Sequence, residues 1–254
     1  MSARALLLLA RRSLVSAIRR PVVLTFSLVQ PALWMLLFGP LMSRAFTTTR
    51  EDTYITFVAP GIVGLTLLFG ASQVGVSLVK DAQSGMLSRM VGSGTGTTVL
   101  LLGKLLGDVL RLSIQASLVL LLGLLAGAKF TIAPAEVPYM VLAAAGLIVS
   151  VGSVSALIAC ATRQPEVMGT FVHLVNIPLL FTSTALVDAK HLPNALRVVA
   201  EVNPVSIFAE AARAVLLGHE PLSANRVGIV GVVALACFIL ATKVYSRAGT
   251  QPDR

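Results

Sequence analysis

The chain has 254 residues, of which 56% are hydrophobic and 12% are charged, and its formal net charge is +9. Soluble domains carry about 25% charged residues, and the mean hydropathy here is +0.88, so the composition excludes a soluble protein and predicts an integral membrane protein. The positive charge does not indicate nucleic-acid binding, because no soluble domain is expected that would carry such a surface.

Residues 1–20 are predicted to form an amphipathic helix that lies in the inner membrane interface. On a helical wheel their arginines occupy about one half, and leucines with Val15 and Ile18 occupy the other. A secretory signal peptide is excluded, because the apolar run Ala5–Ala10 is too short and arginines interrupt it. A frayed basic tail is the alternative. The arginines are Arg4, Arg11, Arg12, Arg19 and Arg20.

Apolar runs of around 20 residues follow, which is the length that a helix rising about 1.5 Å per residue needs to cross a membrane. Only helices and closed barrels satisfy their backbone polar groups in lipid, and these runs lack the alternation of barrel strands. We therefore expect an all-α integral membrane protein with six transmembrane helices. The predicted spans are Val22–Met42, Ile55–Val79, Val109–Ala128, Val137–Ala161, Val167–Val187 and Arg226–Val244.

The distribution of lysine and arginine predicts which side of the membrane each connection faces. With both termini in the cytoplasm, basic residues outnumber acidic ones on the inner side, whereas the two signs balance on the outer side. The chain is thus expected to be a multi-pass protein of the cell membrane. Its excess positive charge then faces the anionic headgroups of membrane lipids.

The segment 80–98, KDAQSGMLSRMVGSGTGT, is the largest predicted cytoplasmic excursion. Its centre is predicted to form one or two helical turns with Met86, Leu87 and Met90 on a common side, and Gly92 ends them. An exposed methionine-rich patch on a short helix suits a groove on another protein. We therefore expect this segment to dock onto a separate subunit that holds the catalytic site. The docking residues are Ser84, Gly85, Met86, Leu87, Ser88, Arg89 and Met90.

Lys104, Asp108 and Arg111 stand near the predicted inner end of the third span, at spacings that place them on one helix face. Asp108 is able to pair with either base, and we interpret the group as a pinned cytoplasmic helix end. A phosphate-binding loop at Gly103 and Lys104 is excluded, because Leu105 follows where such a loop has Ser or Thr.

The predicted outer segment 188–224 contains NPVSIFAEAARAVLLG, which has the signals of a complete helix. Asn203 suits the N-cap, Pro204 the first helical position and Gly218 the position after the end. This helix is too short to cross a membrane and too apolar for water, so we expect it to form a re-entrant hairpin with the short helical pattern before it. An interfacial helix lying flat on the outer surface is the alternative.

Charged residues in this predicted re-entrant region need partners or a hydrated cavity. Glu210 and Arg213 are spaced at i, i+3 and are predicted to pair, while Arg197 and Glu201 stand at i, i+4 in the preceding pattern. We expect the region to act as a gate. The candidate gate residues are Arg197, Glu201, Asn203, Pro204, Glu210, Arg213 and Gly218.

Uncharged polar residues and one histidine within the predicted spans either line a passage or hold helices together. For each of these residues considered alone, we favour the role of holding helices together. Neither a metal site nor a catalytic motif is expected, because the histidines are widely spaced and Cys160 and Cys237 both lie in apolar runs. The candidate pathway residues are Gln30, Gln73, Gln115, His173 and Asn176.

Several short motifs occur in order along the chain. They are Pro60-Gly61, Gly85-Met-Leu-Ser-Arg89, Gly103-Lys104 with Arg111, and Asn203-Pro204 with Arg213 and Gly218. In their order and spacing across the spans, the sequence resembles the ABC-2 type permeases, in particular the membrane subunits of daunorubicin-resistance exporters. The resemblance covers essentially the whole chain. One difference is visible, since similar proteins usually carry a proline where this sequence has Gly92-Ser93-Gly94.

The resemblance implies a single transmembrane domain over residues 1–254, a second permease subunit in a homodimer or heterodimer, and two cytoplasmic ABC ATPase subunits. Residues about 82–92 would be the coupling helix in the ATPase cleft. ATP and Mg would bind to the partner, so that this chain has neither a cofactor nor a catalytic site of its own. The implied function is the outward movement of an amphipathic drug-like, lipid or lipid-linked substrate.

Two other classes of protein stay open at this point. A secondary transporter or channel needs no ATPase, but it usually carries ionisable residues at mid-span, where the polar residues predicted here are neutral apart from His173. A membrane-embedded lipid-modifying enzyme would need acidic or histidine residues clustered at one depth, and the sequence does not predict such a cluster.

Overall fold

The computed structural model of the chain describes residues 28–37, 54–86, 97–162, 164–218 and 224–248. Within these ranges the chain forms helices and their connections and no strand, so the all-α prediction is confirmed for them. The interfacial helix predicted over residues 1–20 lies outside the described residues, as do residues 87–96 of the predicted docking segment 80–98, which include the predicted docking residues Leu87, Ser88, Arg89 and Met90.

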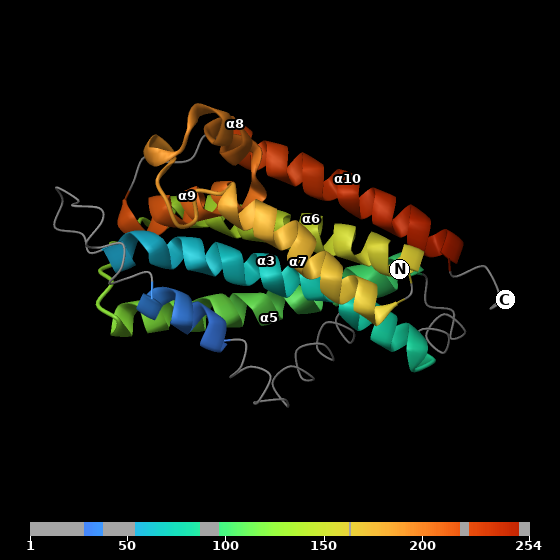
Figure 1. The fold of residues 1–254 in the computed structure, drawn as a ribbon. Helices are drawn as coiled ribbons and strands as arrows, with labels where there is room; N and C mark the ends of the chain where they lie inside the picture. The colour runs from blue at the N-terminus through green and yellow to red at the C-terminus, as the bar shows by residue number, and fades with distance from the viewer. Residues whose placement is uncertain (1–27, 38–53, 87–96, 163, 219–223, 249–254) are drawn as a thin grey trace.

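The long helices lie side by side as a bundle and alternate in direction along the chain (Figure 1). We call the end where α3 begins the Tyr54 end and the end where α3 finishes the Gln83 end. The elements are a helix Leu28–Leu37, α3 Tyr54–Gln83, α5 Thr97–Leu125, η1 Pro134–Glu136, α6 Val137–Thr162, α7 Pro165–Phe181, η2 Ala189–His191, α8 Asn194–Val202, α9 Pro204–Leu217 and α10 Ala224–Ala248.

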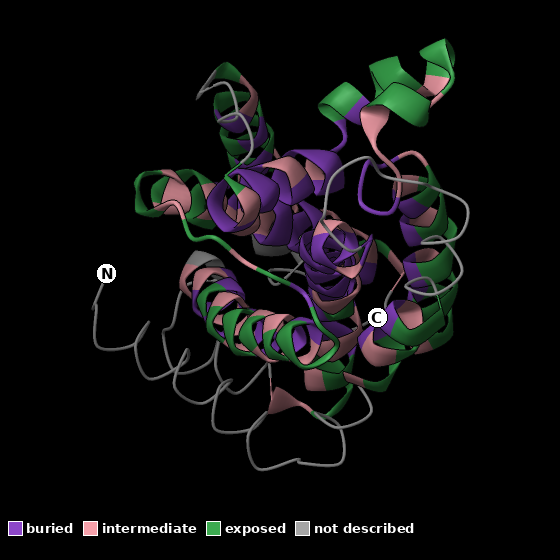
Figure 2. Ribbon diagram, turned by 90° about the vertical axis from the view of Figure 1, so that its left-hand side faces the viewer, coloured by how far each residue is buried: buried purple, intermediate pink, exposed green. Residues whose placement is uncertain are grey.

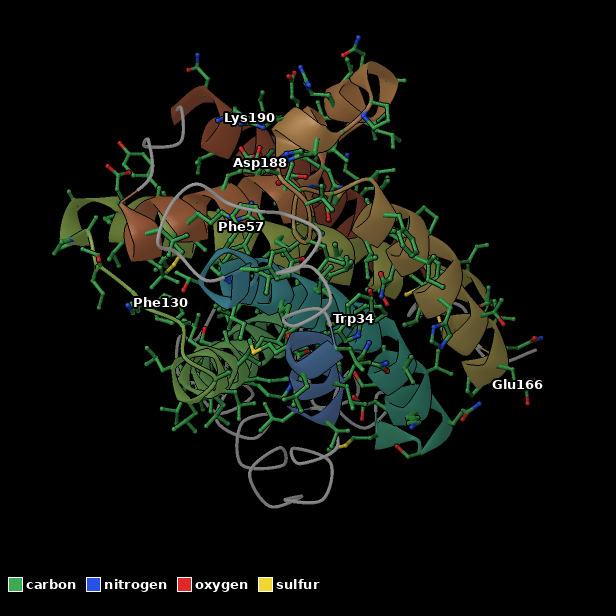
Figure 3. The ribbon with its side chains drawn as sticks, turned by 60° about the vertical axis from the view of Figure 1, so that its left-hand side comes forward. Trp34, Phe57, Phe130, Glu166, Asp188 and Lys190 are labelled. Atoms are coloured by element: carbon green, nitrogen blue, oxygen red, sulfur yellow. The ribbon has the colours of Figure 1, made fainter. Side chains whose placement is uncertain are left out.

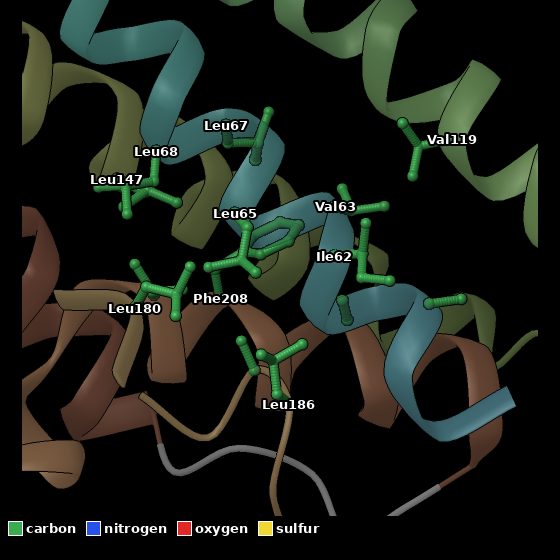
Figure 4. Packing of buried hydrophobic residues seen from close by; sticks show 14 of the residues in the cluster. Ile62, Val63, Leu65, Leu67, Leu68, Val119, Leu147, Leu180, Leu186 and Phe208 are labelled. Carbon is green, nitrogen blue, oxygen red and sulfur yellow. The ribbon is translucent and has the colours of Figure 1, made fainter. Parts of the chain in front are cut away.

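α3 is the central helix of the bundle and packs against α5, α6, α7 and α9. Its side chains Ile62, Leu67 and Leu68 are fully buried. They share one core with Leu147 of α6 and Phe208 of α9 (Figure 4). Close packing of this kind is what holds helices together in a membrane, where removal of apolar surface from water no longer contributes.

Two glycines of α3 allow other backbones to approach it closely. A Cβ atom at Gly61 would collide with the backbone of Ala185, and one at Gly75 would collide with the backbone of Ser155. Glycine inside a helix costs about 1 kcal/mol relative to alanine. At these two positions the close approach of a neighbour explains why glycine occurs in spite of that cost.

A second core lies toward the Gln83 end, where α5 and α7 begin and α10 finishes. Leu78 of α3 packs there with Leu101 of α5, and Met168 of α7 and Ala241 of α10 belong to the same cluster. The two cores together bury α3 along most of its length.

Much of the outer surface of the bundle is exposed (Figure 2), and α5, α7 and α10 carry large apolar side chains there. Leu110, Leu174 and Val232, one from each helix, are 48%, 71% and 69% exposed. Water would not favour so much apolar surface in one continuous exterior, whereas the hydrocarbon of a lipid bilayer does. The described bundle is therefore built for a membrane.

Among the described residues, four helices are long and apolar enough to cross a membrane. Three of them, α3, α6 and α10, cover the predicted second, fourth and sixth spans. The other, α5, begins at Thr97 and not at Val109 as predicted. The prediction placed Lys104, Asp108 and Arg111 at or beyond the membrane edge, and the structure shows that they lie within the helix and are paired.

α7 covers the predicted fifth span only in part. It ends at Phe181 and not at Val187, and its 17 residues reach roughly 25 Å. Pro178 lies near its end, where it removes a backbone donor from the helix. Residues 182–188, which follow α7, are not helical. Of the first predicted span, the structure describes the short apolar helix Leu28–Leu37.

The two short helices predicted before the last span are confirmed as α8 and α9. α9 has 14 residues, with Asn203 as its N-cap, Pro204 in its first turn and Gly218 after it in the left-handed conformation (φ 62°). α3 and α6 contact α9, and nearly all of its residues are buried, whereas α8 is mostly exposed. α9 is therefore a core helix of the Tyr54 end and does not lie flat on the surface.

Candidate functional site

Residues 182–188 cross the Tyr54 end of the bundle between α7 and η2 without forming a helix. We call this segment the strap. Ser183, Thr184 and Ala185 are at most 4% exposed. Because a buried backbone that is not helical must find hydrogen-bond partners elsewhere, the strap depends on side chains from α9 and α3.

Arg213 of α9 is the main partner of the strap. Its Nη2 donates to the carbonyl oxygens of Thr184 at 2.8 Å and Ala185 at 3.0 Å. Its Nε donates to the carbonyl oxygen of Phe57 on α3 at 3.2 Å. Figure 3 shows Phe57 at the same end of the bundle as Asp188, the last residue of the strap. Arg213 thus joins α9, the strap and α3 at one buried point.

Two hydroxyl groups and one glycine complete the contacts of the strap. The Tyr54 hydroxyl donates to the carbonyl oxygen of Leu186 at 2.9 Å, and the Ser206 hydroxyl accepts from the backbone N–H of Thr184 at 3.0 Å. Gly61 lies against the backbone of the strap, as described above. The strap is therefore fixed from both sides, by α3 and by α9.

The sequence did not predict the strap, because its apolar residues continue the pattern of α7. Tyr54, Phe57, Thr184 and Ser206 were consequently missing from the candidate site residues. The available signal was the run of hydroxyl residues that begins at Thr182, shortly after the proline in α7. Such residues compete for backbone hydrogen bonds and favour helix ends.

Glu210 does not pair with Arg213, contrary to the prediction. Its Oε2 accepts from Nη1 of Arg226 on α10 at 2.6 Å, and its Oε1 accepts from the Thr184 hydroxyl at 3.2 Å. The prediction was wrong because the i, i+3 spacing took no account of partners from other segments. Glu210 instead links α10 to the strap.

Asn203 caps α9 and also holds the end of α7. Its Oδ1 accepts from the backbone N–H of Val205 at 2.9 Å, as expected of an N-cap. Its Nδ2 donates to the carbonyl oxygen of Leu179 at 2.8 Å and to the hydroxyl of Thr182 at 3.1 Å. One amide therefore satisfies backbone groups of two helices.

The other end of α9 is held by the connection between α5 and α6. The backbone N–H groups of Thr131 and Ala133 donate to the carbonyl oxygens of Leu216 at 2.8 Å and Val215 at 2.7 Å. Carbonyl groups in the last turn of a helix have no partner within it. These two contacts supply such partners at the Tyr54 end.

The two charged residues of α8, Arg197 and Glu201, contact other segments and not each other. Nε of Arg197 donates to the carbonyl oxygen of Ala189 in η2 at 3.2 Å. The Glu201 side chain is exposed, and its backbone carbonyl oxygen accepts from Nη2 of Arg226 at 3.4 Å. The i, i+4 spacing of Arg197 and Glu201 thus produces no ion pair.

At the Gln83 end, the structure describes the first part of the predicted docking segment. Nζ of Lys104 and Oδ2 of Asp81 form an ion pair at 2.8 Å, which holds the start of α5 to the end of α3. The Ser84 hydroxyl donates to the carbonyl oxygen of Asp81 at 3.0 Å. Gly85 has a φ of 68°, which glycine adopts readily and which turns the chain after α3. Met86 is partly exposed beyond this turn.

The structure does not bring the predicted pathway residues together. Gln30, Gln73 and His173 are exposed on three different helices, whereas Gln115 and Asn176 are 5% and 0% exposed. In the described part of the chain, no three His, Cys, Asp or Glu side chains come together as metal ligands would.

Asn176 holds α7 to α3. This is the role that the sequence favours for each of these residues considered alone. Its Oδ1 accepts from the Ser72 hydroxyl at 2.8 Å. The Ser155 hydroxyl of α6 donates to the carbonyl oxygen of Ser72 at 2.6 Å and accepts from the backbone N–H of Gly75 at 3.0 Å. These contacts join α3, α6 and α7 inside the bundle, so Asn176 lies in a helix interface.

Asp108 and Arg111 form an ion pair at the middle of α5. Their Oδ1 and Nε atoms are 3.1 Å apart, and Nη2 of Arg111 lies 3.4 Å from the carbonyl oxygen of Gly70 on α3. The interpretation as a pinned helix end fits Lys104, which pairs with Asp81. It was wrong for Asp108 and Arg111, because α5 continues for several turns beyond them in both directions.

Comparison with known proteins gives a consistent result over most of the chain. The family model described as ABC-2 type transporter matches residues 4–217. The ycf38 protein of Cyanophora paradoxa, which carries a transport-permease name, is 28% identical over 216 residues, covering 82% of this chain and 72% of that protein. The daunorubicin resistance ABC transporter permease protein DrrB1 of Streptomyces coeruleorubidus is 28% identical over 203 residues, covering 78% of this chain and 70% of that protein. The ycf38 protein of Pyropia yezoensis is 30% identical over 202 residues, covering 77% of this chain and 68% of that protein.

Proposed function

The chain belongs to the ABC-2 type transporter family, and we propose that it is the membrane subunit of an ATP-driven exporter. ATP hydrolysis takes place on a separate cytoplasmic ABC ATPase, two copies of which act with two permease subunits. The observation that carries this proposal is the family match, which extends over residues 4–217 and so includes both the docking segment 80–98 and the strap.

The docking segment is proposed to receive the motion of the ATPase. The ion pair between Lys104 and Asp81 supports this role, because it joins the end of α3 to the start of α5, the two helices that flank the segment. A displacement of residues 87–96 by the ATPase would therefore move α3 and α5 together. ATP binding drives such a rigid-body switch when the ATPase binds ATP better in one arrangement than in the other.

Six spans with both termini in the cytoplasm are the proposed topology, in which the Tyr54 end is the outer end. α8 and α9 then form the re-entrant region at that end. The strap and Arg213 are proposed to act as the outer gate, and this is supported by the position of Arg213, whose contacts join α3, the strap and α9. Opening requires these hydrogen bonds to break together.

The proposed cargo is an amphipathic drug-like, lipid or lipid-linked molecule. Support comes from the name of the DrrB1 relative, which refers to daunorubicin resistance, and from the apolar exterior of the bundle. A cargo with an apolar part partitions into the membrane and reaches the helices from the inner leaflet. ATP hydrolysis supplies the free energy for transport, so the permease alone does not move the cargo against a concentration gradient.

A docking experiment tests the proposed function. The full chain carrying Met86→Asp, Leu87→Asp and Met90→Asp, tagged and purified from its native host, should lose the ATP-hydrolysing subunit that accompanies the unchanged protein. The reason is that charged side chains cannot enter an apolar groove without a large desolvation cost. Membrane insertion should be unaffected, as measured by the amount of full-length protein in the membrane fraction.

The matched control carries Val198→Asp, Val199→Asp and Val202→Asp, which place three negative charges on exposed apolar residues of α8 at the Tyr54 end. This variant should keep the ATPase. Equal co-purification of the ATPase with the triple variant and the unchanged chain would contradict the docking role. ATP-independent accumulation of daunorubicin in vesicles that hold the purified chain alone would contradict the dependence on a partner and support a secondary transporter.

A further inference from the structure

The ion pair of Asp108 and Arg111 occupies an unusual place. Arg111 lies at the midpoint of α5, and Gly70, whose carbonyl oxygen faces it, lies close to the midpoint of α3. Both helices are long and apolar enough to span a membrane. Charged residues inside membrane-spanning helices are costly and occur where they serve a pathway or a binding site.

Arg111 is only partly satisfied by its neighbours. A guanidinium group has five N–H donors, and within the described part of the chain Asp108 and Gly70 accept from two of them. The side chains of Arg111 and Asp108 are 22% and 14% exposed. The pair is therefore neutral as a whole, accessible, and able to donate further hydrogen bonds.

Arg213 shows how an arginine is held in the same protein when carbonyl groups of the chain surround it. It donates to three carbonyl oxygens, lies 3.8 Å above the ring of Phe57, and is 4% exposed. Arg111 has one carboxylate and one long contact to a carbonyl oxygen, and it is open to its surroundings. The contrast favours a ligand-binding role for Arg111.

Polar side chains lead from the Gln83 end to this pair along the contact of α3 with α5. On α5 the spacings i, i+4, i+7 and i+11 place four of them on one helix face. On α3 the series ends at Gln73, which is exposed and lies three residues before Gly70 when the helix is followed from the Gln83 end. We call the set the polar seam; it consists of Lys104, Asp108, Arg111 and Gln115 of α5 with Gly70, Gln73, Ser77 and Asp81 of α3.

We propose that Arg111, with Asp108 as its counter-ion, binds the oxyanion of an amphiphilic cargo midway along α5. The oxyanion is a phosphate or a carboxylate, because the planar fork of a guanidinium matches these groups bidentately. The polar seam leads the headgroup from the Gln83 end to Arg111, while the apolar part of the cargo stays in lipid. This inference rests on the proposed function, since it assigns a headgroup class to the cargo of the exporter.

The experiment measures headgroup preference in the purified full chain, without ATP or ATPase. The probes are a fluorescently labelled phosphatidate and a diacylglycerol with the same labelled tails, so that only the phosphate differs. The unchanged protein should bind the phosphatidate at least about tenfold more tightly, as one or two charge-assisted hydrogen bonds allow. Arg111→Gln should abolish this preference while leaving diacylglycerol binding unchanged.

Two further variants keep the test decisive. Arg111→Gln leaves Asp108 without a counter-ion, which can impair folding, so the double variant Asp108→Asn/Arg111→Gln removes both charges and should show the same loss of preference. Lys129→Gln removes one positive charge from the exposed connection after α5 and should retain the full preference.

Three outcomes would overturn the proposal: no phosphate preference in the unchanged protein, full preference in the double variant, or an equal loss in Lys129→Gln, which would indicate general charge attraction. Failure of the docking experiment would remove the proposed ATPase while leaving this binding result intact. Conversely, a failed binding test would leave the docking result intact.

Discussion

The guanidinium of Arg213 contacts both the ring and the backbone of Phe57. It lies 3.8 Å above the centre of the ring, and its Nε donates to the carbonyl oxygen of the same residue at 3.2 Å. A cation held over an aromatic face contributes about 2 kcal/mol when it is shielded from water. One turn of α3 therefore fixes both the position and the orientation of the arginine that holds the strap.

Arg213→Ala should lower the free energy of unfolding by about 3 kcal/mol, because three buried carbonyl groups lose a charged donor. Arg213→Lys should be intermediate, since an ammonium group cannot form the same fork. Chemical denaturation in detergent measures the effect. Arg197→Ala, which removes an exposed arginine from α8, is the control and should change the free energy by less than about 0.5 kcal/mol. Equal stability of the two alanine variants would contradict the role of Arg213.

Gly61→Ala should destabilise the protein by about 2 kcal/mol or more, because the added Cβ atom would collide with the backbone of Ala185 and push the strap away from α3. Gly231→Ala is the matched control. A Cβ atom there meets nothing within 4 Å, so the gain in helix propensity should leave stability unchanged or raised by up to about 1 kcal/mol. Thermal unfolding of both variants in the same detergent provides the comparison, and a stable Gly61→Ala would show that the strap is not tightly seated.

Glu210 and Arg226 should be energetically coupled. Their ion pair at 2.6 Å is 24% and 30% exposed, so solvent weakens it, and a coupling energy of about 1 kcal/mol is expected. The measurement is a double-mutant cycle of stability with Glu210→Gln and Arg226→Gln. The cycle Glu210→Gln with Arg213→Gln tests the partner that the sequence spacing suggested. A larger coupling in the second cycle would contradict the assigned pairing.

The topology can be tested with single cysteines in a background that carries Cys160→Ala and Cys237→Ala. Asn194→Cys lies on the exposed start of α8 at the Tyr54 end, and Gln83→Cys lies on the exposed last residue of α3 at the opposite end. A membrane-impermeant maleimide should label Asn194→Cys in intact cells and should label Gln83→Cys only after permeabilisation. The reverse pattern would place the Tyr54 end in the cytoplasm.

Local sequence signals predicted the elements whose ends are fixed by their own residues. Asn203 and Gly218 marked the limits of α9, since an N-cap and a left-handed glycine act within one turn of the helix. The apolar runs likewise predicted α6 and α10, because burial or lipid contact along a whole helix requires them.

Features that depend on distant partners could not be predicted from local spacing. The strap continues the apolar pattern of α7 and differs from a helix only because Arg213 and Tyr54 satisfy its carbonyl groups. In the same way, Asp108 and Arg111 appeared to mark a membrane boundary, although their mutual pairing allows them to lie within α5. A charge in a membrane helix can be interpreted only when its partner is known.

The anchoring of α9 at both ends has a consequence for the order of assembly during synthesis. Its first turn is held by Asn203 to the end of α7, and its last carbonyl groups accept from Thr131 and Ala133. These partners precede α9 in the chain, so the ribosome synthesises them before it synthesises α9. Until α9 is made, the end of α7 and the N–H groups of Thr131 and Ala133 lack their partners, so the Tyr54 end is completed late in synthesis.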